Sequence, residues 1–207
     1  MSTFPVELLL SVSALFVVVD PLPVAPMFAS MTQARSRAEI LTIAKRASIA
    51  GALLLLFFAA FGSLLFKVLG IRLDAFRAAG GLLLLLTALD MLRAKSSQRR
   101  CSAREIEDGG REDISIVPLA TPMLAGPGAI ATVMLMVGDA PEIARSAAVA
   151  AAIGVTFVAS YVVLRAAPLL VRLFGASGMA MLQRVMGLLL AAMSIQYIIE
   201  GARRLVS

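Results

Sequence analysis

The sequence predicts an all-α, polytopic membrane protein whose six transmembrane helices form two inverted three-helix repeats, with helices one and four broken. Three observations lead to this prediction. Hydrophobic residues make up 60% of the chain, more than a soluble domain of 207 residues can bury. Charged residues are only 15% of the chain and lie mainly between six apolar runs. The first apolar run of each half is interrupted by prolines at matching positions.

The first repeat, residues 1–92, contains three of the apolar runs. The first run, 6–31, is interrupted near its middle by an aspartate and three prolines. The second run, 47–66, is twenty uncharged residues long, which is enough to cross a bilayer as a helix. The third run, about 73–92, has an arginine one turn after its start. We therefore expect three spans in this half, and the first of them is broken.

A polar stretch, residues 93–113, follows the first repeat. It holds six basic and five acidic residues together with a Gly-Gly pair. Such a composition cannot bury enough apolar surface to fold by itself, so the stretch predicts a linker between the repeats. The single cysteine, Cys101, lies in this linker and can form neither an intrachain disulfide nor a CxxC site.

The second repeat, residues 114–207, again contains three apolar runs. The uncharged run 114–137 is interrupted near its middle, as the first run of the chain is. An alanine-rich run follows at 146–164, where small residues permit close contact between helices. After Pro168, Gly175 and Gly178 predict a turn before the last run, about 179–199.

Two internal matches predict that the halves are repeats. The prolines of the breaks match at an offset of 101 residues: Pro21 with Pro122, and Pro26 with Pro127. The third helices match at an offset of 107 residues: Arg77 with Arg184, Gly80 with Gly187, and Thr87 with Ser194. Because each repeat has an odd number of spans, the second one enters the membrane from the opposite side.

The basic residues predict how the chain lies in the membrane. The net charge of +6 would suit nucleic acid in a soluble protein. Here, with the N-terminus outside, the internal loops 33–46, 93–113 and 165–184 hold thirteen lysines and arginines, against six in the external loops. We expect no nucleic-acid partner, a cytoplasmic linker, and both termini outside a bacterial inner membrane. No basic stretch precedes the first run, so we expect no cleaved signal peptide.

The paired breaks are the predicted functional site. Asp20 and Thr121 are both helix-capping residue types, and each precedes a proline, Pro21 or Pro122, that suits the first position of a helix. Two broken spans at matching positions of two repeats are the sequence pattern of a binding site in secondary transporters. The breaks therefore predict a site near the middle of the membrane.

Alternatively, the half-helices begin at Pro26 and Pro127, with Gly126 as one cap. In both cases two helix N-termini point to the midplane from opposite sides. Each carries free N–H groups and about half a positive charge, which favours an anionic group such as a carboxylate or phosphate. Gly126 and Gly128 would let a ligand approach the backbone closely.

The charged and polar side chains within the spans have several possible roles. Asp20 at this depth costs about 3 kcal/mol, so it either caps a helix, is paired, or is neutralised reversibly by a coupling ion, a proton or sodium. Arg77 and Arg184 either reach the site or extend toward opposite membrane faces. Thr132 and Gln196 are pathway-lining candidates. The full set of candidate substrate-binding residues is Asp20, Pro21, Pro26, Thr121, Pro122, Ala125, Gly126, Pro127, Gly128, Thr132 and Gln196.

The composition argues against catalysis. The chain has no histidine, which excludes a histidine metal site, a histidine proton relay and a Ser-His-Asp triad. It also has neither an HExxH nor a GxSxG motif. We expect a protein that is not an enzyme and that uses no cofactor or bound metal.

Several motifs of the chain resemble one known family. The most distinctive is DISIVPLATPMLAGPGAI at 113–130, and the others are FRAAGG at 76–81 with LDML at 89–92, and RVMG at 184–187 with Gln196. Together they resemble the MarC family of bacterial inner-membrane proteins over nearly the whole chain. The first break of that family usually reads Asp/Asn-Pro-x-Gly-Asn-x-Pro, whereas this chain has Pro-Val at the Gly-Asn positions.

The resemblance implies a substrate class. The MarC family is grouped with neutral amino acid transporters in the LysE superfamily, so it implies an exporter or exchanger of a neutral amino acid. The residues themselves leave a phospholipid or polyprenyl-phosphate carrier open, because helix N-termini bind phosphate equally well. A membrane component that transports nothing is the third alternative. The expected partners are a small carboxylate-bearing solute, the lipid bilayer and a coupling ion, and a homo-oligomer stays open.

Overall fold

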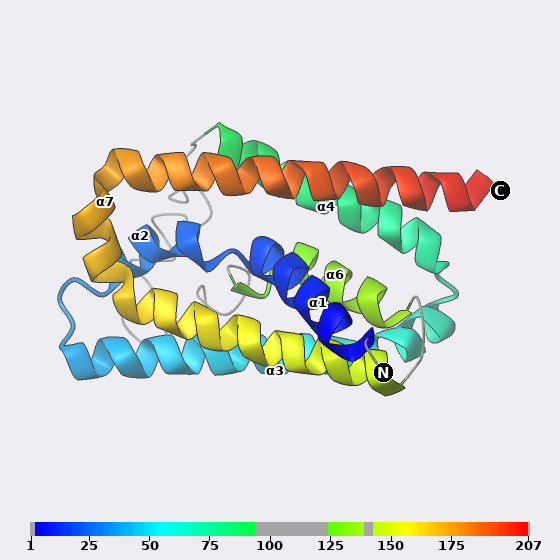
Figure 1. Cartoon of the computed structure of the whole chain (residues 1–207), viewed down its shortest axis with the longest axis horizontal. Coiled ribbons are helices and arrows are strands. Elements are labelled where there is room, and N and C mark those ends of the chain that lie inside the picture. Colours follow the sequence, from blue (N-terminus) through cyan, green and yellow to red (C-terminus); the bar gives the residue numbers. More distant parts are fainter. Residues whose placement is uncertain (1–2, 94–123, 139–142, 207) are drawn as a thin grey trace.

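The computed structural model describes residues 3–93, 124–138 and 143–206, and every regular element in these ranges is a helix (Figure 1). The predicted all-α class is therefore confirmed for the described part of the chain. In chain order the helices are α1 (Thr3–Val19), α2 (Pro21–Met31), α3 (Arg37–Leu69), α4 (Leu73–Leu92), α6 (Pro127–Gly138) and α7 (Ile143–Val206).

The helices pack in three layers. α3 lies beside the first part of α7, and α4 lies beside the last part of α7 on the opposite side of the molecule (Figure 1). α1, α2 and α6 lie between these two pairs. α6 contacts both α3 and α4, while α1 and α2 both contact α7. The broken first span and α6 are thus in the interior of the bundle.

The first predicted break is present between α1 and α2. The two helices meet at Asp20 with a bend of 42°. Asp20 has a left-handed backbone conformation, with φ 42° and ψ 71°, which ends α1. Pro21 then begins α2, at the position where its missing N–H costs no helical hydrogen bond. The prediction that this proline starts a half-helix is confirmed.

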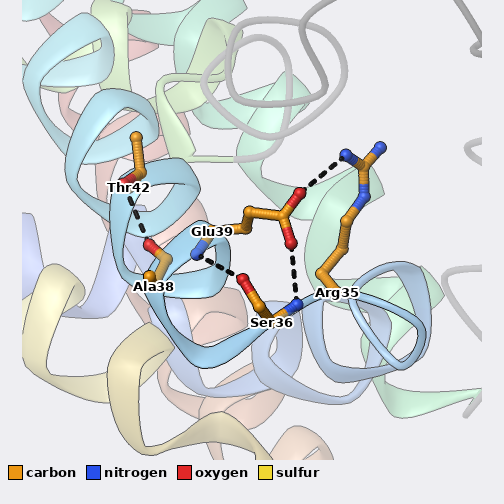
Figure 2. Close-up of polar contacts among 5 residues, drawn as sticks. All are labelled: Arg35, Ser36, Ala38, Glu39 and Thr42. Carbon is orange, nitrogen blue, oxygen red and sulfur yellow. Dashed lines mark hydrogen bonds and ion pairs between the residues drawn. The ribbon is translucent and has the colours of Figure 1, made fainter.

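α3 begins ten residues before the apolar run that predicted it. Ser36 accepts a hydrogen bond from the N–H of Glu39 at 3.3 Å, and the Glu39 carboxylate accepts one from the N–H of Ser36 at 2.8 Å (Figure 2). This reciprocal pair is a capping box, which satisfies two N–H groups at the start of the helix. The guanidinium of Arg35 also forms an ion pair with the Glu39 carboxylate, with 3.6 Å between Nη1 and Oε1. The helix therefore extends through most of the predicted loop 33–46.

α4 has the predicted bounds, and the turn predicted at the glycines that follow Pro168 is confirmed at Gly175. Pro168 is inside α7, which continues as far as Gly175. Gly175 has φ 62° and ψ −177°, a conformation that is essentially restricted to glycine. There α7 changes direction and returns along the opposite side of the bundle (Figure 1). The fifth and sixth predicted runs are the two arms of this element, the first arm before Gly175 and the second arm after it.

Glycines allow α4 and the second arm of α7 to pack closely. A methyl group at Gly81 would lie 2.8 Å from the carbonyl oxygen of Ser194, closer than side-chain carbons come to other atoms. Two glycines of the second arm face α4 in the same way: Gly187 faces Ala88 and Met91, and Gly201 faces Asp74 and Ala78. Residue numbers rise along one helix as they fall along the other, so this packing is antiparallel.

By length and composition, three helical segments of the described chain could cross a membrane: Arg37–Gly62, Leu73–Leu92 and Arg145–Val206. The bent pair α1 and α2 makes a fourth candidate if it is one span. α6 is a shorter apolar helix within the predicted fourth run. Large apolar side chains such as Leu53, Val158 and Leu188 are exposed on the outer helices, as lipid contact requires. The arrangement as six spans in two inverted repeats stays a prediction, and the linker from residue 94 onward lies outside the described residues.

Candidate functional site

Asp20 is buried at the first break. Its exposed fraction is 7%, and within the described part of the chain neither carboxylate oxygen has a hydrogen-bond partner. The side chain does not cap α2, so the capping interpretation of Asp20 is wrong. The physical reason is its backbone, because a capping residue ordinarily has an extended conformation and Asp20 is left-handed. The residue instead uses its N–H, which donates to the carbonyl of Phe16 at 2.9 Å.

The second break differs from the first in where its half-helix begins. α6 starts at Pro127, and the carbonyl of Gly126 accepts the N–H of Ile130 at 3.1 Å. This is the alternative start, with Gly126 as the cap, whereas Pro26 lies inside α2. The other two candidates of this break, Thr121 and Pro122, lie outside the described residues.

The two half-helices start close together in the middle of the molecule. α2 and α6 run from there in opposite directions (Figure 1). A methyl group at Gly128 would lie 3.9 Å from the side chain of Val18, two residues before Asp20. Buried residues of both breaks also belong to one apolar cluster, among them Val19, Ala25 and Ala125. The structure thus brings the start of α6 next to the end of α1.

The space beside Gly128 is already occupied. A side chain there would collide with Leu84 of α4, whose Cγ would lie 3.2 Å from the added carbon. The expected room for a ligand at this glycine is therefore filled, and its small size serves helix packing. Of the neighbouring candidates, Pro21 and Ala125 are buried, Gly126 is half-buried and Pro127 is exposed.

Three hydroxyl groups are buried without a hydrogen-bond partner in the described part of the chain. They belong to Thr132 of α6, Ser48 of α3 and Thr156 of the first arm of α7. Thr132 was expected to line a pathway, whereas Ser48 and Thr156 were not identified from the sequence. The signal for them was available, because both are polar residues within predicted apolar runs. A buried hydroxyl without a partner is costly, so Ser48 and Thr156 join Thr132 as candidate polar groups of the interior.

The two repeat-matched arginines lie in different surroundings. Arg77 has an exposed fraction of 2%, and its guanidinium lies 3.8 Å from the carboxylate of Asp74. Arg184 is exposed on the second arm of α7. Arg77 therefore does not extend outward, and the two matched arginines differ in burial.

Gln196 is also on an exposed face of the second arm of α7. Its amide donates to the carboxylate of Glu200 at 2.9 Å, within the same helix. The structure does not bring this side chain to the interior with Asp20. The Gln196 amide has its hydrogen-bond partner within its own helix. The sequence shows only that Gln196 and Thr132 are both polar residues within apolar runs, so it does not distinguish them.

The chemistry available at the break is that of binding. Asp20 supplies one carboxylate, the ends of α1, α2 and α6 supply backbone groups, and the buried hydroxyls supply neutral donors and acceptors. Within the described ranges no three or more His, Cys, Asp or Glu side chains gather in a group that could hold a metal ion. A buried carboxylate at a break between two helices is typical of transporter sites at the membrane midplane.

Comparison with known proteins agrees with this membrane architecture. Residues 6–206 match the family described as MarC family integral membrane protein. A UPF0056 membrane protein of Methanocaldococcus jannaschii is 37% identical over 196 residues, covering 94% of this chain and 95% of the relative. One from Aquifex aeolicus is 34% identical over 207 residues, covering 100% and 97%.

The UPF0056 membrane protein YhcE of Escherichia coli is 33% identical over 190 residues, covering 91% of this chain and 88% of the relative. None of these three names gives a substrate. No solved structure matches the chain significantly. The match over nearly the full length shows that the chain belongs to the MarC family of integral membrane proteins.

Proposed function

We propose that the chain is a secondary transporter, an exporter or exchanger, whose solute is a neutral amino acid bound between the N-termini of α2 and α6. The observation that carries this proposal is that α6 starts beside the end of α1, at the break where α2 begins, and that α2 and α6 run in opposite directions. Broken helices that meet near the membrane midplane are the binding element of many secondary transporters. Membership of an integral membrane family is consistent with this role.

The backbone supplies the contacts to the solute. In α2, Pro21 and Pro23 have no N–H, so Leu22 and Val24 carry the donors of the first turn. In α6, Pro127 has none, and Gly128 and Ala129 carry them. The positive ends of both helix dipoles point to the same region and favour the carboxylate of the solute. The buried hydroxyls of Thr132 and Thr156 then accept hydrogen bonds from its amino group.

The proposal includes an inverted repeat and an orientation. Antiparallel packing of α4 against the second arm of α7 supports the repeat, because an in-plane twofold axis requires the third helices to run in opposite directions. Such an arrangement allows one repeat to rock against the other around a fixed site. We expect both termini outside a bacterial inner membrane, because the loops that would then lie inside hold more basic residues.

The test is solute uptake by purified protein in liposomes. We expect saturable uptake of radiolabelled alanine into liposomes preloaded with unlabelled alanine, and competition by other neutral amino acids. Protein-free liposomes are the control for leakage. Absence of uptake for every neutral amino acid, with protein that is monodisperse and correctly inserted, would contradict the proposed substrate.

One observation favours a carrier of phospholipid or polyprenyl phosphate as the second candidate. Pro127 is exposed in the first turn of α6, and both neighbouring glycines are half-buried, so the start of this half-helix reaches the surface of the chain. A lipid carrier needs a lateral opening between helices, which exposure at this position favours, and a helix N-terminus binds phosphate as well as carboxylate. Movement of a fluorescent phospholipid or polyprenyl phosphate between leaflets, without alanine uptake, would select this candidate. Transport of neither would select a membrane component that moves no solute.

A further inference from the structure

The carboxylate of Asp20 needs a positive partner that no described side chain supplies. It is buried at 7% exposure, and both its oxygens lack hydrogen bonds within the described chain. No described lysine or arginine forms an ion pair with it, and the buried Arg77 pairs with Asp74. A buried carboxylate without compensation is costly, particularly in a protein that lies in hydrocarbon. An external cation would remove this cost.

The end of α1 adds oxygen atoms next to this carboxylate. The last carbonyls of a helix point beyond its C-terminus and have no helical donor. The carbonyl of Val17 would ordinarily pair with the N–H of residue 21, which is a proline. The carbonyl of Val19 would likewise pair with residue 23, which is also a proline, and the N–H of Asp20 donates to Phe16 instead.

These groups together favour a cation of a single charge. The C-terminus of α1 carries about half a negative charge, which adds to the charge of Asp20. A monovalent ion neutralises one carboxylate, whereas a divalent ion would leave an excess positive charge in a buried site. Several carboxylate and carbonyl oxygens around one charge suit a hard metal ion. Protonation would use one oxygen and leave the carbonyls unpaired.

We propose that Asp20 and the carbonyls at the end of α1 bind one sodium ion. In the transport cycle this is the coupling ion, and that role rests on the proposed function, whereas binding of the ion does not. The solute and the ion then use opposite ends of neighbouring helices, because the solute meets the N-termini of α2 and α6 and the ion meets the C-terminus of α1. The negative solute carboxylate and the positive ion compensate each other in the buried site.

The test measures binding of ²²Na⁺ to the purified full-length protein in detergent, with choline chloride keeping the ionic strength constant. Asp20→Asn removes the charge, and asparagine accepts the left-handed conformation of this position, so the variant should fold. Asp90→Asn is the matched control, because it removes an exposed carboxylate of α4 outside the site. Pro21→Ala restores an N–H for the carbonyl of Val17 and leaves the carboxylate unchanged.

We expect saturable ²²Na⁺ binding by the wild type and by Asp90→Asn. Binding by Asp20→Asn should be weaker by about tenfold or more, because the only charged ligand is lost. Pro21→Ala should also weaken binding, which would assign the carbonyls a role beside the carboxylate. Absence of saturable binding to the wild type, or equal binding by Asp20→Asn, would overturn the proposal. Neutralisation by protons, seen as pH-dependent stability that sodium does not affect, would overturn it as well.

Alanine uptake measured on the same preparations separates this inference from the proposed function. Sodium binding without uptake of any neutral amino acid would remove the proposed transport function and keep the ion site. Alanine uptake by a protein that binds no sodium would remove the ion site and keep transport.

Discussion

At the scale of single residues, the structure separates polar side chains that the sequence could not tell apart. Thr132 and Gln196 both interrupt apolar runs, and both were pathway candidates. Thr132 is fully buried without a partner in the described chain, whereas Gln196 is exposed and bonded to Glu200. The difference is the face of the helix on which each lies, and that face depends on which helices pack together.

This difference predicts how the two side chains affect transport. Thr132→Val and Thr156→Val keep the side-chain shape and remove a buried hydroxyl, so we expect alanine uptake to fall about fivefold for each, the effect of one hydrogen bond of about 1 kcal/mol. Gln196→Leu removes a polar group from an exposed face and should leave uptake unchanged. The measurement is the initial rate of uptake in liposomes at matched protein content. A strong loss in Gln196→Leu with normal rates in both threonine variants would reverse this assignment.

At the scale of elements, glycines determine how the helices approach and where they turn. Gly81 and Gly154 are both helical glycines, but only Gly81 faces a neighbouring helix at close range. Gly175 and Gly70 both have positive φ, and each ends a helical segment. Sequence alone identifies these glycines as candidates for contacts or turns, and the structure assigns each its role.

The helix-packing role is testable with a matched pair of alanine substitutions. A methyl group at Gly81 would lie 2.8 Å from the backbone oxygen of Ser194, so Gly81→Ala should destabilise the protein by about 2 kcal/mol through overpacking. Gly154 has no atom within 4 Å of the same position, so Gly154→Ala should be neutral or stabilise by up to about 1 kcal/mol through helix propensity. Thermal unfolding in detergent gives both values. Equal stability of the two variants would show that α4 and α7 can separate at no cost.

The turn within α7 makes a separate prediction about backbone conformation. Gly175 has open space around it, so Gly175→Ala creates no collision and tests only its φ and ψ. Because this conformation is essentially restricted to glycine, we expect a loss of about 2 kcal/mol in stability. Gly70→Asn is the comparison, since asparagine tolerates the left-handed conformation there and should have a much smaller effect. A thermal midpoint for Gly175→Ala equal to that of the wild type would show that the bend does not depend on this conformation.

At the scale of the whole molecule, composition was sufficient for the all-α membrane class, and proline positions were sufficient for the first break. The bounds of α4 also follow from its apolar run. The start of α3 was misplaced because the capping box at Ser36 lies in a polar stretch, where hydropathy gives no signal. The two breaks were expected to be alike, but Asp20 fits a left-handed turn and Gly126 fits a cap, and only packing decides between such local alternatives.

Orientation in the membrane is the remaining prediction at this scale. In a Cys101→Ser background, we expect Gln33→Cys, in the turn between α2 and α3, to be protected from a membrane-impermeant maleimide in intact cells. Ile71→Cys, in the turn between α3 and α4, should react from outside. The reason is the excess of basic residues in the loops placed inside. A membrane-permeant maleimide labels both as the control, and the opposite pattern would invert the topology.

The bend at Gly175 has a consequence for how the layers can move. The first arm of α7 packs on α3 and the second arm packs on α4. The two arms are joined at Gly175 without the flexible loop that ordinarily connects two helices. Relative motion of the two layers at this end of the bundle would therefore act on the two backbone torsions of Gly175. Because glycine contacts pack α4 closely on the second arm, these two helices would move together as one rigid body. If the protein transports a solute as proposed, the rocking of the two layers would therefore be a rotation about Gly175.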